Sequence, residues 1–389
     1  MFCKRCVMSN QRPASAVEYE HTIATRKRTL HFDDAGVCDA CNYARTKAEQ
    51  VDWDARDREL RELCDRFRRT DGRYDVIVPG SGGKDSVLAS HVLKHKYGMH
   101  PLTVTWAPHI YTDVGWRNFQ SWIHAGFDNV TFTPNGKVHR LLTKLAVENL
   151  LHPFQPFIIG QKMIGPKVGI QYDVPLVFYG ENEAEYGNPL ADNLTASRST
   201  AFWSRDSGDL STLYLGGISG QEILETHGLA RADLAPYLPP TPDQVERWGG
   251  EVRYLGYYLK WTPQWAYYYA VENCGFEANP ERTEGTYSKY NSLDDRIDGF
   301  HYYTTWIKFG IGRATYDAAQ EIRNDHITRE EGVRLVRRFD GEYPQRYAAE
   351  IMNYLDMTEE RFLELCDRFR SPHLWERTSD GWRLRHTVS

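Results

Sequence analysis

The sequence predicts an α/β protein whose parallel sheet is combined with an amino-terminal metal-binding module and a mostly helical carboxyl-terminal region. Two CxxC pairs near the amino terminus indicate the module, and short apolar runs alternating with helical patterns through the middle of the chain indicate the sheet. The chain has 389 residues, of which 41% are hydrophobic and 26% charged, so it can bury a large core. Its net charge of −6 argues against nucleic acid as a partner.

Four cysteines form the two CxxC pairs, Cys3 with Cys6 and Cys38 with Cys41. Each pair can present two thiolates from one tight turn, and two such turns close a tetrahedral metal site. We expect a strand within residues 21–32 and a turn at residues 33–36 to bring the second pair back to the first. Structural zinc, Zn²⁺, is the prediction, because so small a module has little core of its own. Free or redox-active thiols are the alternative, although a redox CxxC would follow a strand and begin a helix.

The location of the protein is expected to be cytoplasmic. The chain has no apolar run of about 18 residues, the length that a membrane span needs. Its first residues, MFCKRC, lack the apolar stretch of a secretory signal. Closely paired cysteines also fit a reducing compartment better than a disulfide framework.

The middle of the chain alternates between strand and helix patterns. Such alternation is typical of a parallel sheet that is covered on both faces and binds ligands at the carboxyl ends of its strands. Strands are expected near residues 74–78, 102–106, 129–132, 175–179 and 251–261. Helices are expected near residues 54–69, 86–97, 116–125, 138–150, 157–172 and 264–274.

A glycine-rich loop follows the first of these strands and opens a helix. Glycines let the backbone approach a phosphate, and free N–H groups at a helix start point toward it. The loop is not a Walker A motif, because Asp85 stands where that motif has Ser or Thr after the lysine. A purely structural turn is the alternative. The residues expected to hold the phosphates are Gly80, Ser81, Gly82, Gly83, Lys84, Asp85 and Ser86.

The segment SGGKDS after a buried strand resembles the PP-loop of the ATP-pyrophosphatase families, which have an adenine-nucleotide alpha-hydrolase-like core. The resemblance implies ATP as a cofactor. These enzymes cleave ATP between its α- and β-phosphates and transfer AMP to a carbonyl oxygen, and a nitrogen or sulfur nucleophile then displaces the AMP. The resemblance also implies that the adenine lies at the end of the second strand, near Trp106, for which a packing role is the alternative.

Acidic residues follow the fourth strand in the segment YGENEAEYG, residues 179–187. Carboxylates at a strand end beside a phosphate loop can hold Mg²⁺, and Asp85 and Glu181 are the predicted ligands. A solvated acidic loop is the alternative. Glu185 or Glu183 is the predicted general base for an incoming amine, on position alone.

Two basic residues, Lys308 and Arg313, flank a glycine-containing turn at an expected helix junction. There they could clamp a departing pyrophosphate, because cations neutralise the charge that develops on a leaving group. Two ordinary surface charges are the alternative.

The segments CxxC…CxxC, PGSGGKDS, YGENEAEYG, YLGYYLKW and KFGIGRAT together resemble the N-acetyl sugar amidotransferase family, from Cys3 to about Asp340. The resemblance implies a carbon–nitrogen ligase that adenylylates the acetamido oxygen of a sugar and replaces it with nitrogen, in O-antigen and lipopolysaccharide biosynthesis. The implied substrate is a nucleotide-linked diacetamido sugar or a nonulosonate precursor. The implied partner is a separate glutaminase that supplies ammonia and resembles that of imidazole glycerol phosphate synthase. The side chains expected to contact the sugar are Tyr257, Tyr258, Trp261 and Trp265.

We therefore expect a zinc module at residues 1–50, a linking helix at 51–72, a PP-loop ATP-pyrophosphatase domain at 73–275, and a helical region at 276–389 that closes the active site. Two other functions stay open. A PP-loop tRNA thiolase usually needs further cysteines near the ATP site, and the acidic balance of the chain also weighs against tRNA. A non-catalytic nucleotide-binding partner of a larger assembly would bind ATP without forming AMP.

Overall fold

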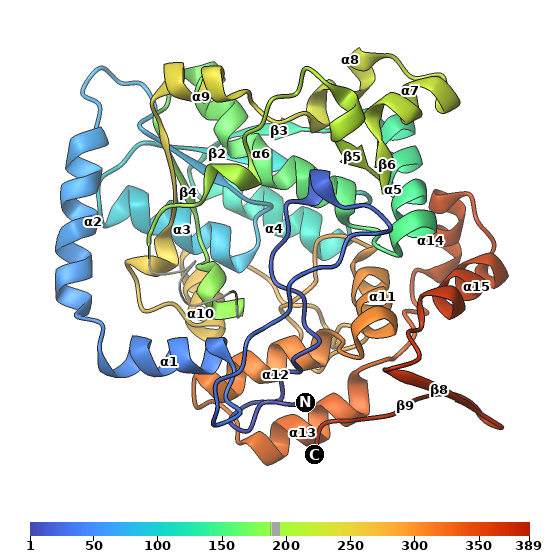
Figure 1. The fold of residues 1–389 in the computed structure, drawn as a ribbon. Coiled ribbons are helices and arrows are strands. Elements are labelled where there is room, and N and C mark those ends of the chain that lie inside the picture. Colours follow the sequence, from blue (N-terminus) through green and yellow to red (C-terminus); the bar gives the residue numbers. More distant parts are fainter. Residues whose placement is uncertain (187, 189–194) are drawn as a thin grey trace.

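A parallel sheet of five strands forms the centre of the protein in the computed structural model, which describes residues 1–186, 188 and 195–389 (Figure 1). Gly187, the last residue of the YGENEAEYG segment, lies outside the described residues. All neighbouring strands of the sheet run parallel, which confirms the predicted α/β class. In spatial order the strands are β3 (Asp128–Phe132), β2 (Pro101–Trp106), β1 (Val76–Pro79), β4 (Leu176–Tyr179) and β7 (Glu251–Tyr254).

Both faces of the sheet are buried, because successive side chains of each strand point to opposite faces. Ile77 of β1 faces one apolar cluster, while Val76 and Val78 face another. The first cluster is covered by α5 (Gly136–Leu150) and α6 (Gln155–Tyr172). The second is covered by α2 (Trp53–Phe67), α3 (Lys84–His95) and α10 (Pro263–Cys274). This explains why the central strands β1 and β4 are apolar throughout, whereas the edge strands β3 and β7 also carry polar residues.

The strand order places two loops together at the carboxyl edge of the sheet. β1 lies between β2 and β4, so the connections after β1 and β4 leave the sheet at a point where the strand order reverses, the usual position of a ligand cleft. The two connections touch: a Cβ on Gly180 would lie 2.6 Å from the carbonyl oxygen of Asp85. The sheet therefore brings the glycine-rich loop and the acidic segment side by side.

The strand predicted for residues 251–261 is shorter than expected. It ends at Tyr254, and the chain turns into η7 (Leu255–Tyr257). The backbone N–H of Gly256 donates to the carbonyl oxygen of Gly180 across 3.0 Å, and a Cβ on Gly256 would lie 3.0 Å from the nitrogen of Asn182. Close approach of the chain to the loop after β4 therefore ends the strand.

The amino-terminal segment runs from the neighbourhood of α12 and α13 toward α5 and α6 (Figure 1). The strand predicted within residues 21–32 is wrong, because this stretch finds only single bridges, Pro13 with Thr29 and Phe32 with Cys38, and no continuous partner. The turn before the second cysteine pair is present: Gly36 has a φ of 78°, and the N–H of Val37 donates to Oδ1 of Asp33 across 2.9 Å. This segment includes η1 (Glu18–Glu20) and leads into α1 (Asp39–Glu49).

The carboxyl-terminal region is helical and ends in a β-hairpin that the sequence did not predict. Both chain ends lie near α13, so the first and last residues of the protein share one side of the molecule (Figure 1). Within the described residues, no helix combines the length and the apolarity needed to cross a membrane. The elements of this region are α11 (Asp298–Phe309), α12 (Arg313–Arg323), α13 (Arg329–Phe339), α14 (Ala348–Leu355), α15 (Glu359–Phe369), β8 (Trp375–Thr378) and β9 (Gly381–Leu384). The other elements of the described chain are α4 (Asp113–His124), η2 (Glu183–Tyr186), η4 (Thr200–Phe202), η5 (Leu210–Thr212), β5 (Tyr214–Leu215), β6 (Ile218–Ser219), α7 (Gly220–His227), α8 (Arg231–Leu234), η6 (Ala235–Tyr237) and α9 (Pro242–Trp248).

Candidate functional site

The glycine-rich loop between β1 and α3 is held in one conformation by its surroundings. A Cβ on Gly80 would lie 2.1 Å from the Cβ of Ser86, and a Cβ on Gly82, whose φ is 83°, would lie 2.6 Å from the Cα of Phe119. Both positions therefore require glycine. Gly83 precedes α3 without any side-chain cap, so the first N–H groups of the helix are available to an anion.

Two cavities meet at this loop. The larger loop cavity has a volume of about 440 Å³, and its walls combine loop residues with Arg313 and Asp294 of the carboxyl-terminal region. The smaller loop cavity has a volume of about 280 Å³, and its walls combine loop residues with Lys162 of α6 and Arg198. Asp85 and Glu181 line both cavities. The loop is therefore the partition between two adjoining spaces.

Asp85 and Glu181 form a close acidic pair at the loop. Burial, and then the charge of Asp85, raise the pKa of Glu181 to about 8. Oδ2 of Asp85 accepts from Nζ of Lys84, and Oδ1 accepts from Nε1 of Trp261 across 2.9 Å. Two carboxylates that resist joint ionisation beside a phosphate loop are a suitable donor set for a divalent cation such as Mg²⁺. The structure thus brings together the two predicted magnesium ligands.

Two aspartates that the sequence analysis missed also face the loop. Asp294 lines the larger loop cavity, where its carboxyl is hydrogen-bonded to Ser81 although burial raises its pKa above the ordinary value. Asp298, the first residue of α11, has its pKa raised to about 7 by burial. A bridge between Tyr111 and Asp295 holds this segment against the connection after β2. The spacing of four residues between Asp294 and Asp298 was the available signal, but only the fold shows what they face.

Arg313 lies in the larger loop cavity, as a residue that contacts phosphates there would have to. Its guanidinium forms an ion pair with Oδ1 of Asp317 across 3.0 Å and donates to the hydroxyl of Tyr302. Burial alone would lower the pKa of Arg313, but the neighbouring Asp317 carboxylate and Tyr302 hydroxyl outweigh it and raise the pKa well above the usual range. Arg313 therefore keeps its positive charge at the loop.

Lys308 and Arg313 line different cavities, so the structure does not bring together the two residues of the predicted clamp. Nζ of Lys308 donates to the carbonyl oxygen of Leu150 across 2.6 Å. Gly310, with a φ of 67°, ends α11, and Arg313 starts α12, so the chain changes direction between them. Closeness in sequence therefore does not bring the two cations together.

Glu185 does not occupy the position predicted for a general base, because its side chain is buried away from both loop cavities. Its Oε1 accepts from Nζ of Lys47 across 2.6 Å, and both side chains are almost fully buried. This ion pair connects α1 to the segment after β4. The other predicted base, Glu183, does line the smaller loop cavity, where Oε1 lies 3.5 Å from Nη2 of Arg198.

Trp106 packs in the core beside the loop. It is 3% exposed, its ring centroid lies 5.0 Å from that of Phe132, and a Cβ on Gly160 would lie 2.2 Å from its ring. It also lines a cavity of about 130 Å³ that reaches Gly80 and Ser81. Trp106 thus combines a packing role with a position at the end of β2, beside the phosphate loop.

The aromatic side chains expected to contact the sugar lie elsewhere, which is a further correction. Among the described residues that line the two loop cavities, none is Tyr257, Tyr258, Trp261 or Trp265. Tyr258 and Trp261 are each 1% exposed in the core, and Tyr257 stacks against Arg56. Trp261 acts on the site indirectly, through its hydrogen bond to Asp85.

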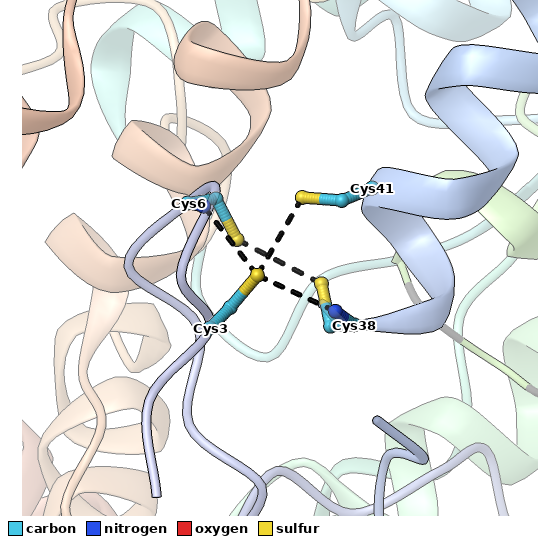
Figure 2. Close-up of side chains that lie close together, drawn as sticks. All are labelled: Cys3, Cys6, Cys38 and Cys41. Carbon is cyan, nitrogen blue, oxygen red and sulfur yellow. Dashed lines mark hydrogen bonds between the residues drawn. The ribbon is translucent and has the colours of Figure 1, made fainter. Parts of the chain in front are cut away.

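The four predicted metal ligands come together at one buried site (Figure 2). Sγ of Cys3 lies 3.8 Å from Sγ of Cys41, and Sγ of Cys6 lies 3.8 Å from Sγ of Cys38. All four side chains are fully buried, and three backbone N–H groups donate to Sγ of Cys3. Thiolates at about 2.3 Å from one tetrahedral ion lie about 3.8 Å apart, so these residues could bind a metal.

Three comparisons relate parts of the chain to known proteins. Residues 284–388 match the family described as "LPS biosynthesis protein WbpG-like, C-terminal domain". The chain is 31% identical over 84 residues to "Uncharacterized protein MJ1599" of Methanocaldococcus jannaschii, a match that spans 22% of this chain and 29% of the relative's length. The solved structure "U34-tRNA thiolase NcsA from Methanococcus maripaludis with its [4Fe-4S] cluster" has 12% identity and a TM-score of 0.29, with 82% of this chain and 89% of that chain covered. A TM-score this low supports no conclusion about function. The carboxyl-terminal region is thus similar to a domain of lipopolysaccharide biosynthesis proteins, and it supplies Asp294 and Arg313 to the cavity at the phosphate loop.

Proposed function

We propose that the protein is an ATP-dependent amidotransferase that converts the acetamido group of a sugar to an acetamidino group during surface-glycan biosynthesis, with release of AMP and pyrophosphate. One observation carries this proposal. Arg313 and Asp294, from the region similar to a lipopolysaccharide biosynthesis domain, share a cavity with Ser81 and Lys84 of the phosphate loop. A site that joins a nucleotide loop to such a domain is suited to activating a sugar with ATP.

The reaction proceeds in two steps. The acetamido oxygen attacks the α-phosphorus of ATP, a new oxygen–phosphorus bond forms, and the bond to the β-phosphate breaks to release pyrophosphate. Ammonia then attacks the activated carbon, and the carbon–oxygen bond breaks to release AMP, which carries away the former acetamido oxygen. An amide is a poor electrophile, and the first step supplies the leaving group that it lacks.

The residues at the loop suit the first step. Lys84, Arg313 and the free N–H groups at the start of α3 are positioned to stabilise the negative charge that moves onto pyrophosphate. Asp85 and Glu181 would hold Mg²⁺, which would neutralise phosphate charge when bound. Trp261 and Lys84 orient Asp85 by donating to its two oxygens.

The second step needs less from the protein. In the first step the adenylylated amide gives up its N–H proton to the departing pyrophosphate or to solvent. An amidine is a strong base, so its amidinium form retains all three protons that ammonia brings, and a dedicated carboxylate base is dispensable once neutral ammonia arrives. This agrees with the burial of Glu185 in its ion pair with Lys47. We propose that a separate glutaminase subunit supplies the ammonia.

The metal at the four cysteines is proposed to be a structural zinc ion. Sulfur separations of 3.8 Å suit one ion at the centre, whereas an iron–sulfur cluster must fit several iron atoms between its thiolates. A tRNA thiolase would use cysteines at the ATP site. No cysteine lines either loop cavity in the part of the chain that the structure describes, which favours the amidotransferase.

An activity assay tests this proposal. Purified protein is incubated with ATP, Mg²⁺, ammonium chloride and a panel of nucleoside-diphosphate sugars that carry one or two acetamido groups. Free ammonia replaces the glutaminase. We expect AMP and a sugar product in which nitrogen has replaced oxygen, with a mass that shifts when nitrogen-15 ammonium is used. The proposal is refuted if no sugar yields either AMP or an amidine. Sulfur transfer to tRNA would favour the thiolase.

A further inference from the structure

A third cavity, here called the basic cavity, adjoins both loop cavities and has a volume of about 320 Å³. Four cationic side chains line it: Arg12 and Lys27 from the amino-terminal segment, Lys162 from α6 and Lys308 from α11. Glu18 is its one carboxylate among the described residues. Such an excess of positive charge in a concave site is suited to a ligand with more than one negative charge.

We propose that the basic cavity binds the diphosphate of a nucleoside-diphosphate sugar and so positions the sugar for reaction at the phosphate loop. This rests on the proposed function. Four cations outnumber one carboxylate, so the cavity has a net positive charge. A ligand with a diphosphate diester, which carries two negative charges, balances that charge better than a ligand with a single carboxylate. The apolar and aromatic walls, including Ile158, Phe309 and Tyr316, suit the remainder of such a ligand.

The position of the basic cavity separates it from the site for ATP. None of the described residues that line it belongs to the phosphate loop. It nevertheless shares Arg12 and Tyr316 with the larger loop cavity, and Gln161 and Lys162 with the smaller one. A diphosphate held here would lie next to the bound ATP without occupying its place, as a second substrate requires.

The cationic groups retain hydrogen-bonding capacity. Nζ of Lys308 donates to the carbonyl oxygen of Leu150 across 2.6 Å, and Nζ of Lys162 donates to that of Ala16 across 3.2 Å. An ammonium group has three N–H donors, so each lysine can also bind an anion. Within the described residues, the buried Nε of Arg12 and the buried Nδ1 of His301 lack hydrogen-bond partners, and both residues line the cavity. Buried polar atoms without partners indicate an absent ligand or water.

The electrostatics of the cavity also favour an anion. Burial, and then the nearby charge of Lys27, lower the pKa of Lys308 to about 7. Burial, and then the charge of Arg198, lower the pKa of Lys162. The charged form of a lysine that is buried among other cations is energetically unfavourable unless an anion binds beside it. A bound diphosphate would relieve this repulsion and keep Lys308 protonated.

A metal ion is the competing occupant, because Glu18, His21 and His152 place ligand atoms within 4.8 Å of one another. The surrounding charges oppose it. Nζ of Lys27 lies 3.4 Å from Oε1 of Glu18, and Lys308 lines the same cavity, so a divalent cation would enter a positive field. The charge of the cavity therefore favours the diphosphate, and metal binding becomes an outcome to test.

The four-cysteine site does not line the basic cavity, but it holds both ends of a chain segment that does. Arg12, Glu18 and Lys27 all lie in the segment between Cys6 and Cys38, so a metal at the cysteines would fix both ends of the chain that supplies them. This gives the amino-terminal module a second effect beyond its own stability. It holds three charged residues against α6 and α11.

The test is calorimetric binding of UDP, GDP, CDP and thymidine diphosphate to the full-length protein saturated with a non-hydrolysable ATP analogue. We expect at least one diphosphate to bind together with the analogue. Lys27→Met and Lys308→Met should each weaken it by about tenfold or more, while the analogue retains its affinity within about twofold. The matched control is Lys167→Met, because Lys167 is another half-buried lysine of α6, donates to the carbonyl oxygens of Ala235 and Pro236, and does not line the cavity.

Three results would overturn the inference. The first is that no diphosphate binds, or that binding is unchanged in the Lys27 and Lys308 variants. The second is competition between the diphosphate and the ATP analogue with loss of both in Lys308→Met, which would assign Lys308 to ATP. The third is a second tightly bound metal ion that His152→Ala removes. If the protein forms the amidine but Lys27→Met and Lys308→Met bind the diphosphate as before, only the assignment of the basic cavity is refuted. If the diphosphate binds in the basic cavity but no amidine forms, only the proposed reaction is refuted.

Discussion

The indole nitrogen of Trp261 donates to Oδ1 of Asp85 across 2.9 Å, and this bond ties a fully buried side chain of the core to the phosphate loop. Trp261→Phe removes this bond and should leave Asp85 free to turn away from the site. Because a hydrogen bond to a charged group contributes about 1.5–3 kcal/mol, we expect the Mg²⁺ concentration for half-maximal activity to rise by about tenfold. Trp248→Phe is the control, because its indole donates to the carbonyl oxygen of Val174 instead. An equal Mg²⁺ requirement in both variants would remove Trp261 from the site.

Lys84 should be essential for pyrophosphate release. Lys84→Met removes a cation beside the loop, and we expect pyrophosphate release to fall about a hundredfold or more, as for other groups that stabilise developing charge. Lys94→Met, on the same helix, removes an exposed lysine that donates to the carbonyl oxygen of Gly126 and should leave the rate unchanged. Phosphate-release assays with both variants check this. Comparable rates in the two would refute the loop assignment.

The buried pair of Lys47 and Glu185 should act on stability rather than on catalysis. Glu185→Gln leaves Lys47 without a counter-charge, and unfolding by denaturant should show a loss of about 3 kcal/mol or more. Lys47→Met should give a similar loss. The turnover of folded Glu185→Gln should stay within about tenfold of the original, whereas loss of a general base costs about 100-fold or more. A loss of that size with unchanged stability would restore Glu185 as the base.

The four-cysteine site should hold about one metal ion per chain, because its sulfur atoms match one tetrahedron. Cys38→Ser should lose the ion, lower the melting temperature and weaken diphosphate binding in the basic cavity, whose amino-terminal wall it anchors. Cys366→Ala, on the buried face of α15, is the control and should retain the ion. Elemental analysis and thermal unfolding measure these effects. Retention of the ion by Cys38→Ser would contradict the assignment.

Binding of a nucleoside-diphosphate sugar should weaken as the pH rises through about 7, the pKa to which burial and Lys27 lower Lys308. Above that pH Lys308 loses the proton that attracts the anion. The charged and titratable groups that face Lys308 do not reverse this trend; they are Lys27, Lys162, Glu18, His21, His152 and His301. Burial opposes ionisation of Glu18, but Lys27 and the histidines outweigh it and lower the pKa of Glu18. Burial also lowers the pKa of each of the three histidines.

Calorimetry with the tightest-binding sugar nucleotide checks this pH dependence, because its diphosphate diester keeps a constant charge over the range. We expect a three- to tenfold weaker affinity at about pH 8.5 than at about pH 6, and a smaller change in Lys308→Arg. The same shift acts on folding. The unfolded chain binds this proton more tightly than the folded one, so the free energy of unfolding should rise between about pH 7 and the ordinary lysine pKa of 10.5. An affinity independent of pH would exclude Lys308 from the site.

The fold and the loop were predictable from local patterns, but the partners of single side chains were not. Apolar strands, the glycine turn before α3 and the CxxC pairs are short-range signals, and the structure contains each of them. Lys308 and Glu185 were misplaced because their surroundings come from Leu150 and Lys47, which are more than a hundred residues away in sequence. Asp294 was overlooked for the same reason, since only the packing of the carboxyl-terminal region brings it to Ser81.

In the proposed reaction, ATP activates the oxygen of a sugar acetamido group. The most direct measurement uses an acetamido sugar nucleotide labelled with oxygen-18 in the carbonyl group, with ammonium and ATP, and mass analysis of the released AMP. We expect the phosphate of AMP to acquire the label in proportion to the amidine formed, and Lys84→Met to release no labelled AMP. AMP without the label, formed alongside amidine, would contradict the proposed reaction.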